Sequence, residues 1–117
     1  SAWLKKAEWT VRHVKKIKEI IEELNPGLQI RYVKNYIALT KNNNNYFGFH
    51  WRSNNKSQID FRVTEEIAEE AKTMLDENDI QFIYRGQFIR FTLSDELIQD
   101  KPDIFQKLYS IAVKYWK

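Results

Sequence analysis

Basic and aromatic side chains gather in residues 30–63, and they are the best candidates for chemistry in this chain. Cations beside aromatic rings can hold an anionic partner, because the cations contact phosphates while the rings stack on bases. The same composition also describes a small α+β core with a solvated cationic face. The predicted binding residues are Arg31, Lys34, Lys41, Tyr46, Arg52, Lys56 and Arg62.

Residue types that carry catalysis or bind metals are few and scattered. Cysteine is absent, which removes disulfides, thiolate ligands and cysteine nucleophiles together. The two histidines, His13 and His50, have no carboxylate at metal-ligand spacing. The three glycines are isolated, so no phosphate-binding loop is present, and no serine lies in a nucleophile elbow. We therefore expect no enzymatic activity, no cofactor and no metal.

A metal-dependent nuclease is a further alternative. Asp60 lies on a predicted strand, and Glu70 and Lys72 follow in an acidic-x-Lys spacing. Such enzymes need carboxylates that converge on one ion. Glu70 and Lys72 instead fall on the exposed face of a predicted helix, which disfavours this alternative.

Length and composition predict a single α+β domain over residues 1–117. The chain is 43% apolar, enough for one core without a disulfide or metal. No apolar run approaches the roughly 20 residues of a membrane span, and no signal peptide is visible. Together with the absence of cysteine, this favours a cytoplasmic protein with no membrane partner. Because the chain begins at Ser1 without methionine, we expect a cleaved tag or a domain excised from a longer protein.

The net charge of +3 conceals an asymmetry between the two halves of the chain. Residues 1–62 hold 12 Lys and Arg against 5 Asp and Glu, whereas residues 63–117 hold 7 against 11. A basic half favours an anionic partner. The alternative is that the two halves attract each other across the fold.

The element pattern begins with one long helix over residues 3–24, about 33 Å in length, which Asn25, Pro26 and Gly27 end. Period-two alternation then predicts strands over residues 28–33, 36–40, 46–51 and 58–63, with turns at residues 42–45 and 53–56. The polar face of these strands would carry Arg31, Tyr46, His50, Gln58, Asp60 and Arg62.

The remaining residues predict a middle helix, a hairpin and a C-terminal helix. Thr64 is the expected cap of the middle helix, and the hairpin strands are residues 80–84 and 89–93. Ser94 starts a short helical turn, and Pro102 opens the last helix. The predicted fold is a mostly antiparallel sheet, a meander plus a hairpin, packed against the long first helix, the middle helix and the last helix.

One segment resembles a known family. Leu24-Asn25-Pro26, then Lys34-Asn35-Tyr36-Ile37-Ala38 with Lys41, and an Asn-rich turn into Tyr46-Phe47 are similar to a small prokaryotic domain of unknown function. That family is often labelled a predicted transport protein and is YjbR-like in style. The specific part covers about residues 24–49. The resemblance implies an α+β accessory module, often appended to nuclease-like or restriction-associated bacterial proteins, and it brings no catalytic residues.

The first functional hypothesis is therefore a non-catalytic binding module that docks a protein, or a second copy of itself, through the sheet or the helix of residues 3–24. The alternative is DNA or RNA binding through the basic aromatic sheet of residues 30–63. Steep salt dependence would distinguish the second hypothesis from the first.

Overall fold

The computed structural model describes residues 2–117, in which a helix, four strands, a helix, two strands and three further helices follow one another. Their order is α1 (Ala2–Glu22), β1 (Gln29–Tyr32), β2 (Ile37–Lys41), β3 (Asn44–Trp51), β4 (Ser57–Arg62), α2 (Glu65–Glu77), β5 (Ile83–Arg85), β6 (Phe88–Leu93), α3 (Asp95–Asp100), α4 (Asp103–Ala112) and the short 3-10 helix η1 (Val113–Trp116).

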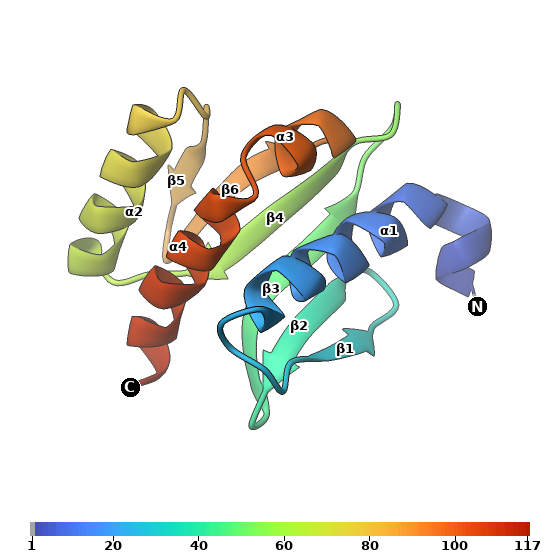
Figure 1. Ribbon diagram of the computed structural model, residues 1–117, viewed down its shortest axis with the longest axis horizontal. Coiled ribbons are helices and arrows are strands. Elements are labelled where there is room, and N and C mark those ends of the chain that lie inside the picture. The colour runs from blue at the N-terminus through green and yellow to red at the C-terminus, as the bar shows by residue number, and fades with distance from the viewer. Residues whose placement is uncertain (1) are drawn as a thin grey trace.

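The strands form one antiparallel sheet in the order β1-β2-β3-β4-β6-β5, which confirms the predicted α+β class. The first four strands are a meander, and β6 pairs with β4 on one side and with β5 on the other. In Figure 1, α1, α3 and α4 lie across the same face of this sheet, and α2 packs beside α4. Within the described chain, the opposite face of the sheet has no helix over it, and we call it the open face.

The core lies between the helices and the covered face of the sheet. Alternate strand residues point into it, and Phe47, Phe49 and Phe61 are fully buried there. Ile17 and Ile21 of α1 complete the contact from the helix side, with no exposed surface. Each such side chain stabilises the fold by roughly 1.5–3 kcal/mol relative to an exposed one.

The first helix differs from the predicted single long helix of residues 3–24, because it has a kink near its start and ends at Glu22. Ala7 has φ −159° and ψ 71°, so an extended residue interrupts α1 near its start, as Figure 1 shows. The first turn is redirected, and Trp3 becomes 5% exposed while its Nε1 donates to the Val33 carbonyl at 2.7 Å. The last turn ends at Glu22, whose carboxylate accepts from the backbone amides of Gly27 and Leu28.

Asparagines with positive φ make the two tight turns of the meander. Asn42 and Asn43, with φ 53° and 65°, join β2 to β3, and Asn54 and Asn55, with φ 59° and 61°, join β3 to β4. Asparagine tolerates this region because its short side chain bonds the local backbone. The prediction of a four-residue turn over residues 42–45 is wrong, since residues 44 and 45 already belong to β3.

A β-bulge changes which way Tyr46 points. The pairing register between β2 and β3 shifts between Leu39 and Thr40, so Tyr46 has no partner across the ladder. Its ring therefore lies on the covered side, packed edge-on against Tyr109 at 5.3 Å and Trp116 at 6.3 Å. Tyr46 is only 8% exposed, and the prediction that it lies on the polar face is wrong.

The predicted helix starts are confirmed by their caps. Thr64 Oγ1 accepts from the Ile67 amide at 3.2 Å, and Ser94 Oγ accepts from the Leu97 amide at 3.1 Å. The buried stripe of α2 is the predicted one and comprises Ile67, Ala68, Ala71, Met74 and Leu75.

Candidate functional site on the open sheet face

Strand register places six residues in one row across the open face. Directly paired residues of antiparallel strands point to the same side, so each pair continues the row onto the next strand. Crossing the sheet from β1 to β5, this central row comprises Arg31, Ala38, Gly48, Asp60, Arg90 and Ile83. Its middle is low, because alanine and glycine stand there between longer side chains.

A neighbouring row adds two arginines and an aromatic ring. Phe88 pairs with Arg62 on one side and with Arg85 on the other. The Arg62 guanidinium lies 4.9 Å from the centre of the Phe88 ring, and Phe88 as a residue is 36% exposed. Four arginines therefore stand on the open face of the strands against one carboxylate, that of Asp60.

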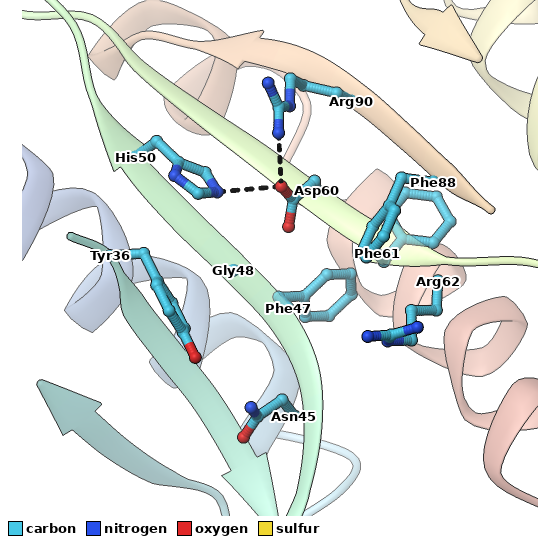
Figure 2. Close-up of a pocket in the computed structure, with 10 residues that line it drawn as sticks. All are labelled: Tyr36, Asn45, Phe47, Gly48, His50, Asp60, Phe61, Arg62, Phe88 and Arg90. Carbon is cyan, nitrogen blue, oxygen red and sulfur yellow. Dashed lines mark hydrogen bonds and ion pairs between the residues drawn. The ribbon is translucent and has the colours of Figure 1, made fainter. Parts of the chain in front are cut away.

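Asp60 is the buried centre of the open face, with 11% of its side chain exposed. His50 Nε2 donates to Asp60 Oδ2 at 2.9 Å, and Arg90 Nη2 donates to the same oxygen at 3.1 Å (Figure 2). Because the carboxylate only accepts, His50 carries a proton on Nε2 in this contact. Two donors, one of them a permanent cation, thus compensate the charge of Asp60.

A hollow of about 300 Å³ opens beside this carboxylate. Figure 2 shows Tyr36 and Asn45 standing across from Arg62 and Phe88, with His50, Asp60 and Arg90 along one end. The rings of Tyr36 and His50 are 6.0 Å apart. A second hollow of about 190 Å³ shares Phe88 and Arg90 with the first, so the open face is grooved as far as β5.

The structure gathers some of the sequence-predicted binding residues on this face and disperses the others. Arg31 and Arg62 lie on the open face, and Arg52 reaches it by donating to Gln58 Oε1 at 2.6 Å. Lys34 and Lys56 are exposed on the loops that follow β1 and β3.

Two further predicted residues are engaged elsewhere. The Lys41 ammonium donates to the Pro26 carbonyl at 2.9 Å, and the Tyr46 ring is buried under α4 and η1. Tyr46 therefore offers no ring for stacking on the open face.

Sequence reasoning did not assign the hairpin residues Arg85, Phe88 and Arg90 to the surface. A signal was present, because the apolar phase of Ile89 and Phe91 sends Phe88 and Arg90 to the opposite side of β6. What the sequence lacks is the pairing of β6 with β4, which places Arg90 beside Asp60.

The nuclease-like residues do not converge on one site. Asp60 points to the open face, whereas Glu70 of α2 binds Lys114 at 2.6 Å beside α4. Lys72 pairs with Glu69 and lies 4.4 Å from the centre of the Tyr84 ring. Among residues 2–117, no three His, Cys, Asp or Glu side chains gather to hold a metal ion.

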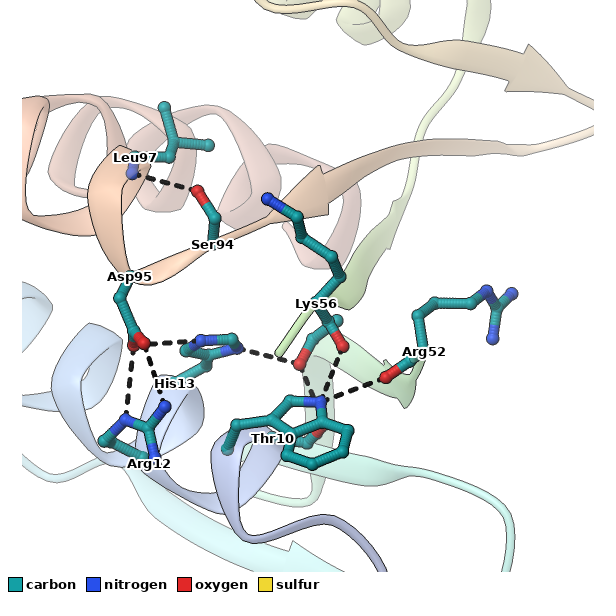
Figure 3. Close-up of polar contacts among 10 residues, drawn as sticks. Thr10, Arg12, His13, Arg52, Lys56, Ser94, Asp95 and Leu97 are labelled. Atoms are coloured by element: carbon teal, nitrogen blue, oxygen red, sulfur yellow. Dashed lines mark hydrogen bonds and ion pairs between the residues drawn. The ribbon is translucent and has the colours of Figure 1, made fainter. Parts of the chain in front are cut away.

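A second polar cluster has the residue types of a hydrolase triad but lies inside the fold (Figure 3). His13 Nδ1 lies 2.8 Å from Ser57 Oγ, and His13 Nε2 lies 3.1 Å from Asp95 Oδ1. Ser57 and His13 have no exposed surface, so no substrate reaches the hydroxyl. Burial lowers the pKa of His13, and the hydrogen bond from Arg12 lowers that of Asp95. This cluster ties α1 to β4 and α3.

Comparison with known proteins adds no assignment. A scan against protein-family models finds no match, and searches of curated proteins and of solved structures also find none. The resemblance of residues 24–49 to the predicted transport family stays a prediction. In the described part of the chain, no helix is both long and apolar enough to cross a membrane.

Proposed function

We propose that this protein is a binding module whose open sheet face holds single-stranded nucleic acid. The observation that carries the proposal is the uncovered groove of the sheet, in which arginines stand beside the exposed ring of Phe88. Guanidinium groups neutralise phosphates and release counterions, and exposed rings stack on unpaired bases. A paired duplex hides its base faces, which is why a single strand fits this surface better.

The charge distribution supports an anionic partner. Within residues 2–117, the only ion pairs that join the basic half to a carboxylate of the acidic half are those of Arg12 and His13 with Asp95. Arg31 and Arg62 of the basic half are exposed on the open face, together with Arg85 of the acidic half, so their charge is directed outward. Ion pairing between the two halves therefore accounts for little of the excess of Lys and Arg in residues 1–62.

Docking of a protein through α1 has less support from the geometry. The apolar stripe of α1 is buried in the core of this chain. Val14 and Ile17 have no exposed surface, and Trp3 is 5% exposed. Among the α1 side chains that the structure describes, the exposed ones are charged except for Ala2. If oligonucleotides fail to bind, docking of a protein on the open sheet face is the next hypothesis to test.

The test is fluorescence anisotropy with labelled single- and double-stranded oligonucleotides of about 12 nucleotides, at about 50 and about 200 mM salt. We expect the single strands to bind more tightly, with affinity falling steeply between the two salt concentrations. Arg62→Ala should lower the salt slope by about 0.7, the share of one phosphate on a single strand.

Lys16→Ala is the matched control, because Lys16 is exposed on α1, on the other side of the molecule, and its loss changes the net charge equally. An equal fall in slope for the two variants would show that binding follows total charge and not this face. The absence of binding at low salt would overturn the proposal.

A further inference from the structure

The two oxygens of Asp60 have different surroundings. Oδ2 accepts from both His50 and Arg90, which uses its capacity for hydrogen bonds. Among the described residues, Oδ1 receives no hydrogen bond, and it lies over Gly48 on the wall of the hollow. The buried carboxylate therefore presents one acceptor oxygen, held in place by the contacts of the other.

The position of Gly48 belongs to the same arrangement. A Cβ on this residue would stand 2.6 Å from Asp60 Oδ1, closer than side chains tolerate. Gly48 is absent from the residues with positive φ, so its backbone conformation does not demand glycine. The missing side chain instead lets Asp60 lie across the strand and keeps the floor of the hollow low.

Donor groups face the hollow from the other sides. Asn45 Oδ1 accepts from Arg31 Nη2 at 3.3 Å, which leaves the Asn45 amide nitrogen as a donor. The Arg62 guanidinium stands on the side of the hollow away from Tyr36, and the Tyr36 ring forms a flat wall (Figure 2). The hollow thus combines one fixed acceptor, two donors and an aromatic surface.

From this arrangement we infer that the hollow selects guanine within the bound strand, an inference that rests on the proposed function. Guanine presents two adjacent donors, N1–H and the N2 amine, and the two lone pairs of Asp60 Oδ1 can accept from both. Its O6 and N7 acceptors suit an arginine or an amide donor, here Arg62 or Asn45. The Tyr36 ring supplies the stacking surface.

The other bases match this hollow less well. Adenine offers an acceptor, N1, where guanine has a donor, and that acceptor would face the Asp60 carboxylate. Uracil and thymine place a carbonyl on each side of their single N3–H donor, and cytosine has one amine beside the acceptor N3. A buried acceptor left without a donor costs affinity, so each mismatch should be rejected.

The experiment varies the ligand while the protein stays unchanged. Anisotropy is measured with uridine tracts, and with the corresponding thymidine tracts, that carry guanine, inosine, adenine or cytosine at one central position. Guanine should bind about tenfold more tightly than adenine or cytosine. Inosine, which lacks only the N2 amine, should lose most of that gain.

Two protein variants then locate the preference. Asp60→Asn should abolish the advantage of guanine while leaving binding of the plain tract measurable. Thr92→Ala should preserve it, because Thr92 is exposed on the same face of β6 and does not line the hollow. If Asp60→Asn fails to fold, the comparison of guanine with inosine on the natural protein still decides the inference.

Three results would count against the inference. Plain tracts that bind as tightly as guanine-containing ones would overturn the guanine assignment and leave the proposed function standing. A preference for cytosine or adenine would overturn it in the same way. Failure of every oligonucleotide to bind would overturn the proposed function and this inference together.

Discussion

Replacing Ser57 by alanine should destabilise the protein strongly, although the change removes a single oxygen. Ser57 Oγ lies 2.8 Å from His13 Nδ1 and 2.8 Å from Thr10 Oγ1, and none of the three side chains is exposed. Because Asp95 accepts at His13 Nε2, the proton sits there, and Nδ1 must accept from the serine hydroxyl. The Ser57 oxygen in turn accepts from Thr10, so every polar atom in the series is satisfied.

The magnitude follows from what the substitution leaves behind. A buried acceptor without a partner costs about 1–3 kcal/mol, and His13 Nδ1 cannot find another donor without giving up Asp95. Thr10 Oγ1 also loses its partner, and the carbonyls one turn earlier belong to Lys6 and Ala7, where α1 is interrupted. We therefore expect Ser57→Ala to lower the free energy of unfolding by about 2–3 kcal/mol.

The assay is urea unfolding followed by tryptophan fluorescence and circular dichroism, with the m-value compared between variants. Ser110→Ala is the control, because its hydroxyl bonds only the Gln106 carbonyl on an exposed helix face, and its effect should stay within about 0.5 kcal/mol. A Ser57→Ala variant as stable as this control would refute the reasoning. Adding Thr10→Val should cost little more, since it removes the second unpaired hydroxyl.

Three other predictions follow from the structure. Burial lowers the pKa of His13, so on acidification the unfolded chain binds a proton before the folded protein does. The free energy of unfolding should therefore fall as the pH drops below about 6.5. In His13→Gln, the free energy of unfolding measured with urea should depend less on pH in that range. Gly48→Ala should cost about 1–3 kcal/mol and abolish the preference for guanine while plain tracts still bind, because the added Cβ displaces Asp60; an unchanged preference in the anisotropy assay would contradict this. Thr64→Ala should cost about 1 kcal/mol in the same denaturation assay through loss of the α2 cap.

Local structure was largely predictable from residue pattern. Alternating apolar residues predicted the strands of the meander, and the helical spacing from Ile67 to Leu75 predicted the buried stripe of α2. Thr64 and Ser94 are residue types that favour the cap position, and in the structure their side chains accept from amides three residues later. These features depend on neighbours in sequence, so the sequence carries them directly.

Two local predictions failed where tertiary packing prevailed over periodicity. Tyr46 follows the polar phase of its strand in sequence, yet the bulge opposite Leu39 and Thr40 turns it toward Tyr109. Ala7 continues a helical pattern, yet the chain bends there, and Trp3 is buried with its indole bonded to the carbonyl of Val33. In both places, burial of an aromatic ring offsets the cost of interrupting the regular strand or helix.

The sequence by itself determined the α+β class, the caps, and the side of β1 and β4 on which Arg31 and Arg62 lie. Only the tertiary structure decided that β6 lies between β4 and β5, with Arg90 beside Asp60 and Phe88 beside Arg62. It also decided that α1, α3 and α4 pack on one face, which leaves the hollow over Gly48 open. The physical reason is that the choice of strand partner and of covered face depends on core packing between residues distant in the chain, which period-two and period-3.6 patterns do not encode.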